Sequence, residues 1–159
     1  MSSIFKQKDI NLSLKQFLES LDIKDDVILN SYDDLFLCAI SKSGHLLLDE
    51  AEIVGGRSSV AIEDIFLLKK KDLMEIRKSS ANISLELAQT FLINNSITPS
   101  PTKESLKALA ESDLVIYAPG TPHSSLYPSY ITSKFGTVLQ NNKNPKILIC
   151  NIGADYETP

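Results

Sequence analysis

The 159-residue sequence lacks several features that define common classes of protein. It has no tryptophan, only two histidines and only two cysteines. Cys38 and Cys150 lie in apolar runs without other Cys or His nearby, so we expect two buried, reduced thiols rather than a disulfide or a zinc site. No apolar run reaches the roughly 18–20 residues of a membrane span, and the N-terminus has no signal-peptide pattern. These absences predict a soluble, cytoplasmic protein without a membrane partner.

Positive charge is scarce as well. The 16 basic residues are outnumbered by 20 acidic ones, which leaves a net charge of −4. Such a chain has no general attraction to nucleic acid, so no nucleic-acid partner is expected and any bound anion must be held by local geometry. We interpret the basic run Lys69–Lys71 as solvent-exposed. No Ser-His-Asp order, paired metal ligands or aromatic-and-basic stripe is present, which argues against a hydrolase, a zinc enzyme or an RNA-binding protein.

What the sequence does contain fits one α/β domain over residues 1–159, with 43% apolar and 23% charged residues. The chain stops directly after a predicted strand and loop, so we expect part of a longer protein. Whether it forms a homo-oligomer stays open. The expected elements are a helix at 10–21, a β-hairpin region at 27–68, a helical connection at 69–101 and a βαβ unit at 102–159.

Within the hairpin region, short apolar runs predict strands at 27–29, 35–40, 45–54 and 62–68. Ser41–Gly44 is the expected turn, and Gly55–Ser59 is interpreted as a flexible break because it lacks the spacing and the lysine of a P-loop. The connection at 69–101 has helix-forming composition, although residues 91–93 are equally compatible with a strand.

The last third predicts two parallel strands. Thr102 is a favourable N-cap for a helix over 105–111. Residues 113–118 and 146–151 are nearly all apolar, which is typical of strands buried on both faces of a parallel sheet. The predicted fold is therefore α/β, a Rossmann-like parallel sheet with helices on both faces, plus an antiparallel hairpin extension in the N-terminal half. A right-handed crossover would join the two strands.

The candidate ligand site follows the first of these strands, because open α/β sheets bind ligands at the carboxyl ends of their strands. Thr121 suits an N-cap and Pro122 the first helical position. The backbone N–H groups and hydroxyls that follow would then hold a phosphate, and Gly120 would let it approach closely. The candidate phosphate-binding residues are Pro119, Gly120, Thr121, His123, Ser124, Ser125 and, from the second strand end, Asn151.

Structural explanations stand beside this hypothesis. The loop could be only a capped strand-to-helix turn, and His123 could hydrogen-bond a phosphate or close the loop. After the second strand, Asp155 or Glu157 could meet a metal ion or a ribose hydroxyl. A polar loop with an Asx turn explains the same residues.

The loop also resembles a known family. Ser112 to Pro128 reads SDLVIYAPGTPHSSLYP, which is similar to the A-D-x-I-x-x-G-P-G-S-L-Y-T-S-x-x-P motif of gluconeogenesis factors (YvcK type) and the G-P-S-N-P-x-T-S-I-x-P loop of phospholactate transferases (CofD type). Pro119, Ser125 and Pro128 agree with both branches. Further on, Ile149-Cys150-Asn151 followed by Glu157-Thr158 resembles the family's V-C-N-x-M-T-Q-x-G-E-T segment, with one deletion. The resemblance covers 100–158 well and the remainder loosely.

The resemblance implies a Rossmann-like core that binds a nucleoside diphosphate. In the regulatory branch the ligand is a UDP-sugar. In the transferase branch phospholactate passes from a guanosine diphosphate carrier to a deazaflavin with Mg²⁺. Carried over here, Pro119–Thr121, Ser124 and Ser125 would hold phosphate and Asn151 would line the same cleft. We expect a regulatory binding domain, with part of a transferase as the alternative, and no catalysis from this chain alone.

The sequence departs from the family pattern at several points. It has no glycine-rich strand–turn–helix at its N-terminus and lacks the acidic residues that usually lie near that segment. Ala118 replaces the first glycine of the loop, and Ser133-Lys134 stands where the family often has Pro-Gly. These departures leave the catalytic residues unknown.

Overall fold

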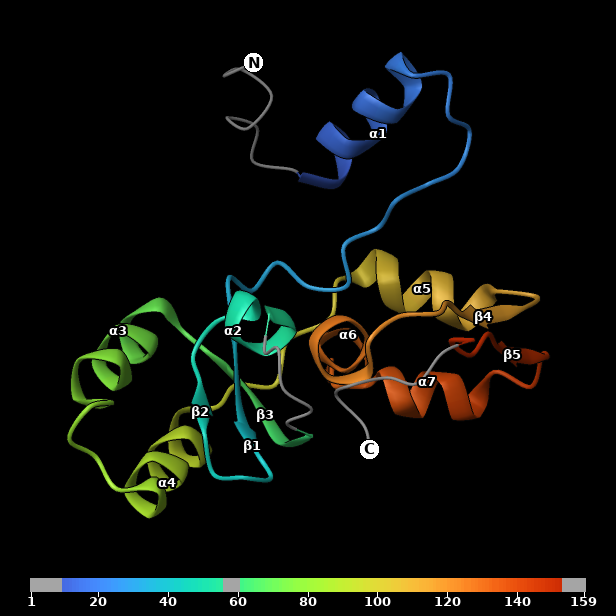
Figure 1. Ribbon diagram of the computed structural model, residues 1–159. Helices are drawn as coiled ribbons and strands as arrows, with labels where there is room; N and C mark the ends of the chain where they lie inside the picture. Colours follow the sequence, from blue (N-terminus) through green and yellow to red (C-terminus); the bar gives the residue numbers. More distant parts are fainter. Residues whose placement is uncertain (1–9, 56–60, 153–159) are drawn as a thin grey trace.

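The computed structural model describes residues 10–55 and 61–152 (Figure 1). Its elements in chain order are α1 (Ile10–Ser20), β1 (Phe36–Ser41), β2 (Leu46–Leu47), α2 (Glu50–Gly55), β3 (Ile62–Leu68), α3 (Lys70–Ser79), α4 (Leu85–Asn95), α5 (Lys103–Glu111), β4 (Val115–Tyr117), the π-helical turn η2 (Pro122–Leu126), α6 (Tyr127–Tyr130), α7 (Phe135–Asn141) and β5 (Lys146–Leu148). They form an antiparallel sheet of order β2-β1-β3 and a parallel pair β4-β5. The chain is thus mixed α/β.

The two sheets lie in two lobes beside each other, and α1 stands apart from both (Figure 1). The first lobe contains β1–β3 with α2, α3 and α4. The second contains α5, α6, α7 and the parallel pair. No helix within 10–55 or 61–152 is long and apolar enough to cross a membrane.

The predicted hairpin is confirmed in the first lobe. β1 pairs antiparallel with β2 and, along its whole length, with β3, so that Cys38 lies opposite Phe66. Gly44 closes the turn between β1 and β2 with φ of +81°, a left-handed conformation that glycine adopts without strain. The turn expected at Ser41–Gly44 is therefore present.

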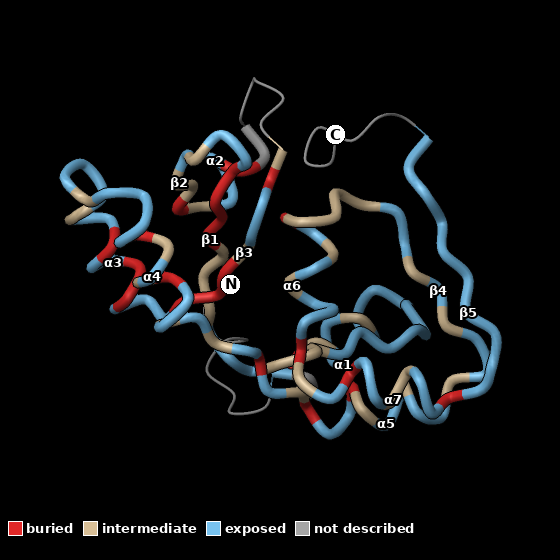
Figure 2. The backbone as a smooth tube through the Cα atoms, turned by 90° about the horizontal axis from the view of Figure 1, so that it is seen from below, coloured by how far each residue is buried: buried red, intermediate tan, exposed pale blue. Residues whose placement is uncertain are grey.

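The hydrophobic core belongs to this lobe. Buried side chains from β1 and β3 pack against the apolar faces of α3 and α4. In Figure 2 the buried residues are concentrated in these elements. The buried members of this cluster are Cys38, Ile40, Leu48, Phe66, Leu68, Leu73, Ile76, Ala88 and Leu92. A smaller cluster of Ala39, Ile53 and Ile62 includes a residue of α2.

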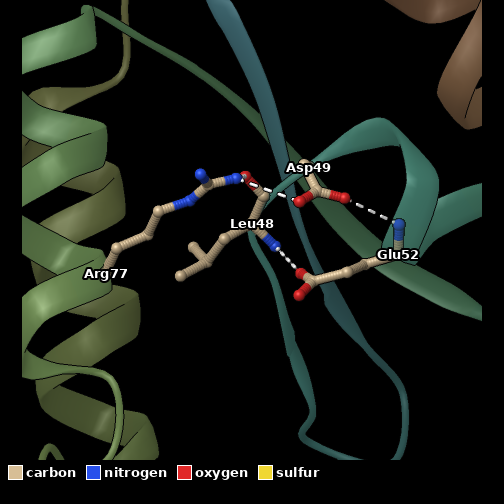
Figure 3. Close-up of polar contacts among 4 residues, drawn as sticks. All are labelled: Leu48, Asp49, Glu52 and Arg77. Carbon is tan, nitrogen blue, oxygen red and sulfur yellow. Dashed lines mark hydrogen bonds and ion pairs between the residues drawn. The ribbon is translucent and has the colours of Figure 1, made fainter.

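The strand predicted over 45–54 is wrong, because only Leu46–Leu47 is extended and α2 begins at Glu50. A variant of the capping box starts this helix. The Asp49 carboxylate accepts from the Glu52 backbone N–H at 2.8 Å, and the Glu52 carboxylate accepts from the N–H of Leu48, the residue before the N-cap, at 2.6 Å (Figure 3). The pattern Asp-x-x-Glu is a helix-start signal that outweighs the apolar run Leu46–Leu48.

The strand predicted over 27–29 is wrong as well, since this segment has no strand partner. The carbonyl groups of Leu29 and Asn30 instead accept from the hydroxyl and the backbone N–H of Thr102, at 2.7 and 2.9 Å. Thr102 also accepts from the Ser105 N–H at 3.0 Å, so it caps α5 as expected. The segment before β1 therefore anchors α5 instead of joining a sheet.

The helical connection expected over 69–101 is present as α3 and α4. Residues 91–93 lie inside α4, which settles their ambiguity in favour of a helix. Ser84 caps this helix by accepting from the Leu87 N–H. The flexible break expected at Gly55–Ser59 lies, apart from Gly55, outside the described residues.

The second lobe contains the predicted pair of parallel strands. They are shorter than predicted, and the expected burial on both faces is wrong, because the residues of β4 are intermediate or exposed and those of β5 are exposed. Ile116 of β4 lies opposite Ile147 of β5, and the chain between them forms η2, α6 and α7. The side-chain amide of Asn142, at the end of α7, donates to the Leu109 and Ser112 carbonyls at 2.9 and 3.0 Å and so ties α7 to the end of α5. The strand–helix–strand order is confirmed, within a parallel sheet of two strands in the described part of the chain.

The two cysteines differ, contrary to the expectation that both are buried. Cys38 is fully buried in β1, and burial raises its pKa to about 12, with nearby Asp49 and Glu52 opposing the smaller effect of Arg77. Cys150 is exposed. We predict that a thiol reagent at pH 8 modifies Cys150 within minutes and Cys38 only after unfolding, because the thiolate is the reactive form. Two fast-reacting thiols in the native chain would contradict this placement.

Candidate ligand-binding site

The parallel pairing of β4 and β5 brings the two predicted ligand segments together. The loop after β4 runs from Ala118 to Ser125, and Asn151 follows β5. The Asn151 side-chain amide donates to the Gly120 carbonyl at 3.0 Å, across 31 residues of sequence. The carboxyl ends of both strands therefore share one edge, as expected for an α/β ligand site.

Thr121 organises a cluster of three hydroxyl groups. Its Oγ1 lies 2.6 Å from the Ser124 hydroxyl and 2.7 Å from the Ser125 hydroxyl. Ser124 is buried and Ser125 is exposed, so the cluster extends from the interior to the surface. Hydroxyl groups both donate and accept, so the cluster can redirect its protons towards a bound anion.

Thr121 does not act as the predicted side-chain cap. It occupies the N-cap position before Pro122, but its hydroxyl makes no hydrogen bond to a backbone N–H of the turn. The Ser125 N–H donates to the Thr121 carbonyl at 3.0 Å, so this N–H is not available to a ligand. The backbone N–H groups expected to hold a phosphate therefore do not include that of Ser125, because the fourth residue after an N-cap makes the first helical hydrogen bond.

His123 and Pro119, two further candidate residues of the loop after β4, have different surroundings. The His123 ring packs edge-on against Tyr127, with centroids 5.2 Å apart, and is partly buried. This contact supports the reading in which His123 closes the loop. Pro119 is exposed immediately before Gly120.

Gly120 has a packing role in the loop. A Cβ atom at this position would lie 3.1 Å from Cδ2 of Leu126, a contact that requires a shift of a few tenths of an ångström. We predict that Gly120→Ala lowers the free energy of unfolding by about 1 kcal/mol through this overpacking. The control Gly136→Ala, in α7 with nothing within 4 Å of the added methyl, is expected to raise it by about 0.5–1 kcal/mol through helix propensity. Urea unfolding of both variants measures the difference, and equal effects would contradict it.

A cavity of about 530 Å³ lies beside the loop, between the two lobes. Its wall on the loop side includes the buried Ser124 and Pro128. The opposite wall combines apolar side chains with two basic and two acidic residues: Phe36, Leu67, Leu73, Met74, Lys70, Arg77, Asp49 and Glu50. Its volume is in the range of small-molecule sites, which commonly span about 300–1,000 Å³.

Arg77 is a site residue that the sequence analysis missed. Its guanidinium donates to the Leu48 carbonyl and to the Asp49 carboxylate, both at 3.0 Å, and so connects α3 to the start of α2 (Figure 3). Both side chains are partly exposed, so this ion pair contributes little to stability, about 0–1 kcal/mol. Nothing in the spacing around Arg77 indicates the cavity, because β3 and α3 reach the loop only through tertiary packing.

The second candidate cluster is only partly covered by the structure. Asp155 and Glu157, proposed for a metal ion or a ribose, lie outside the described residues. Within 10–55 and 61–152, no group of three or more His, Cys, Asp and Glu side chains is placed to hold a metal ion. The Mg²⁺ expectation stays a prediction.

The strand ends, the hydroxyl loop and the adjoining cavity define a mixed α/β protein with a candidate ligand site at the carboxyl ends of its parallel strands. Comparison with known families narrows this class: the family model described as 2-phospho-L-lactate transferase CofD matches residues 1–158. The chain belongs to the CofD family, as the loop motif predicted.

Two relatives that carry the gluconeogenesis-factor name agree with this assignment. A Nostoc sp. protein carrying the gluconeogenesis-factor name is 24% identical over 138 residues, 80% of this chain and 30% of that protein. The gluconeogenesis factor of Bacillus subtilis is 30% identical over 66 residues, 42% of this chain and 20% of that protein. The chain therefore spans less than a third of the length of these relatives.

Two solved structures of one Bacillus halodurans protein, described in one case as a member of the UPF0052 family, share the fold. Their TM-scores are 0.63 and 0.65 at 17% identity, and they cover 90% and 93% of this chain. This chain corresponds to 37% and 39% of those structures.

Proposed function

We propose that this chain is a regulatory module of the gluconeogenesis-factor type. It would bind a nucleoside diphosphate that resembles a UDP-sugar. The observation that supports it most is the meeting of Asn151 with the hydroxyl loop of Thr121, Ser124 and Ser125 at the shared edge of two parallel strands. The pair β4-β5 would belong to a Rossmann-like sheet, in which this edge is the usual ligand position.

The diphosphate would lie at the hydroxyl cluster. Hydroxyl donors to a charged phosphate form stronger hydrogen bonds than neutral pairs do, and the net charge of −4 provides no general attraction that could replace them. The sugar or base would extend into the cavity behind Ser124, where apolar side chains and the charged groups of Asp49, Glu50, Lys70 and Arg77 suit a ring that carries polar groups. Pro119, Gly120 and His123 would shape the loop around the ligand.

A transferase is the second candidate function, and the description of the matching family model favours it. In that case the loop would hold a donor made of a nucleotide and a phosphate-linked group, with Mg²⁺ at the phosphates. Phosphoryl-type transfer depends mainly on positioning and charge stabilisation, so a chain without an evident general base is compatible with it.

A thermal-shift titration with GDP, UDP and UDP-sugars, each with and without Mg²⁺, tests the proposal. A ligand that binds the native state raises the melting temperature as its concentration increases. Saturable stabilisation by a UDP-sugar without product would support the regulatory module. Because no catalysis is expected from this chain alone, the transferase is assayed in the whole protein. Mg²⁺-dependent transfer of phospholactate from its guanosine diphosphate carrier to a deazaflavin acceptor would support it instead. The absence of any shift across the whole panel would overturn both.

A further inference from the structure

The hydroxyl loop contains no positive charge of its own. None of the residues from Ala118 to Leu126 is lysine or arginine. In the same lobe, the ammonium groups of Lys143 and Lys146 donate to carbonyls at the end of α7, at 2.9 and 2.6 Å. Lys146 begins β5 and therefore lies at the amino end of the parallel pair, whereas the loop follows the carboxyl end. A diphosphate at the loop would gain most from a cation supplied by another part of the chain.

The first lobe supplies two cations to the cavity beside the loop. Lys70 and Arg77 belong to α3 and line the same cavity as Ser124. Asp49 and Glu50 line it as well, so the charges of the lining cancel. A cation in this cavity therefore selects a ligand by its position and hydrogen-bonding geometry, because the lining has no net positive field.

Arg77 makes both of its described contacts through one nitrogen. Its Nη2 donates to the Leu48 carbonyl and to the Asp49 carboxylate, both at 3.0 Å (Figure 3). Among the described residues, Nη1 and Nε donate to no other group, which leaves three N–H groups for a ligand. The planar guanidinium matches two oxygens of one phosphate group. Arg77 can therefore bind a phosphate and still keep its contact with Asp49.

The partner of Arg77 belongs to a segment that adjoins the hydroxyl loop. Asp49 caps α2, and α2 contacts η2 directly. The chain segments that join the lobes are also tied together, because the Ser100 N–H donates to the Asp33 carboxylate at 2.7 Å. The Ser133 N–H donates to the Pro99 carbonyl at 2.9 Å and so connects these segments to the second lobe. The two walls of the cavity are therefore held in a defined arrangement.

We propose that Arg77 binds the second phosphate of the diphosphate, while the hydroxyl cluster of Thr121, Ser124 and Ser125 binds the first. This inference rests on the proposed function and narrows its ligand class. The site selects diphosphates against monophosphates, because a monophosphate at the hydroxyl cluster leaves the free edge of Arg77 without an anion. Lys70 adds a point charge on the same helix but lacks the planar fork.

The test compares nucleotides that differ by one phosphate. UDP with UMP, and GDP with GMP, are titrated calorimetrically into the wild-type chain and into Arg77→Gln, without Mg²⁺ so that a metal ion does not replace the guanidinium. We expect the wild-type chain to bind one diphosphate about 10-fold or more tightly than its monophosphate, the scale of lost hydrogen bonds to charge. Arg77→Gln should remove most of this difference and leave the monophosphate Kd within about twofold.

Two further variants separate position from charge. Lys71→Gln removes the same charge from α3 at a side chain that is 78% exposed and outside the cavity wall. It should leave both affinities within about twofold. Arg77→Lys keeps the charge and loses the fork, so its preference for the diphosphate should lie between those of the wild-type chain and Arg77→Gln. It also decides the question if Arg77→Gln does not fold, since an unchanged preference in Arg77→Lys would overturn the assignment.

The outcomes distinguish this assignment from the proposed function. Diphosphate affinity that is the same in Arg77→Gln as in Lys71→Gln would refute the role of Arg77 and leave nucleotide binding intact. An equal loss of diphosphate and monophosphate affinity in Arg77→Gln would refute it too, because the side chain would then act on the whole site. If the wild-type chain bound none of the four nucleotides, the proposed function would fail, and the assignment with it.

Discussion

Replacing Leu68 with alanine is expected to lower the free energy of unfolding by about 2–5 kcal/mol, the range for buried leucine truncations. Leu68 is the last residue of β3, has no exposed surface, and belongs to the cluster that includes Leu73, Ile76 and Leu92. The truncated side chain leaves a cavity between the sheet and the two helices, because close-packed neighbours relax only partly. Since domains of this size are stable by only about 5–15 kcal/mol, the variant should be close to the limit of folding.

Urea unfolding followed by circular dichroism measures this loss. Leu87→Ala is the matched control, because it removes the same atoms from a side chain that is 62% exposed on α4. The control is expected to change stability by less than about 1 kcal/mol. If both variants lost the same amount, the core would not lie between β3 and the helices α3 and α4.

The sequence predicts elements well where the local signal and the tertiary packing agree. The turn at Gly44, the N-cap at Thr102 and the all-apolar strands around Ile116 and Ile147 were all found from residue type and spacing. In each case a single local requirement, such as a positive φ, a helix cap or a run of apolar residues, decides the element. The expected burial of the two strands on both faces is wrong, because residues of β4 and β5 are exposed or intermediate. Apolar periodicity likewise predicted α1 and α5.

The errors arise where a short apolar run is ambiguous. Residues 45–54 contain Leu46–Leu48, which suits a strand, but the Asp49 and Glu52 capping box turns the chain into a helix. Val27 and Ile28 are apolar, yet the carbonyls next to them bind Thr102 and Ser105, a contact about 75 residues away that no local pattern reveals. Lys134 adopts φ of +67°, which explains why the family often has glycine at this position.

The candidate site was predicted only in part, because sequence reveals local features of the chain and not the contacts made by tertiary packing. The loop residues and Asn151 follow from strand ends, which sequence shows. The place of Arg77 in the wall of the cavity depends on tertiary packing between segments far apart in the chain, which sequence does not show. Gly120 and Ser125 have structural partners in Leu126 and in the Thr121 carbonyl, so their residue types reflect packing as well as any ligand.

The double variant Thr121→Ala with Ser125→Ala is expected to weaken nucleoside-diphosphate binding by about 1–3 kcal/mol, the range for lost hydrogen bonds to a charged group. This corresponds to roughly a 5- to 150-fold increase in Kd. Both hydroxyls belong to one cluster, in which Thr121 Oγ1 lies 2.7 Å from the Ser125 hydroxyl, so removing only one would leave its neighbour able to compensate. Isothermal titration with the diphosphate that stabilises the chain most gives the Kd.

The control variant makes the same two kinds of substitution, Ser→Ala and Thr→Ala, at positions outside the loop. Ser129→Ala with Thr137→Ala removes two exposed hydroxyls from α6 and α7 and is expected to leave Kd within about twofold. Ser124 is left intact in both variants, because it is buried and its loss would combine a binding effect with a packing effect. If the loop variant bound as tightly as the control, the phosphate would have to lie elsewhere, and the cavity bordered by Lys70 and Arg77 would become the next place to look for it.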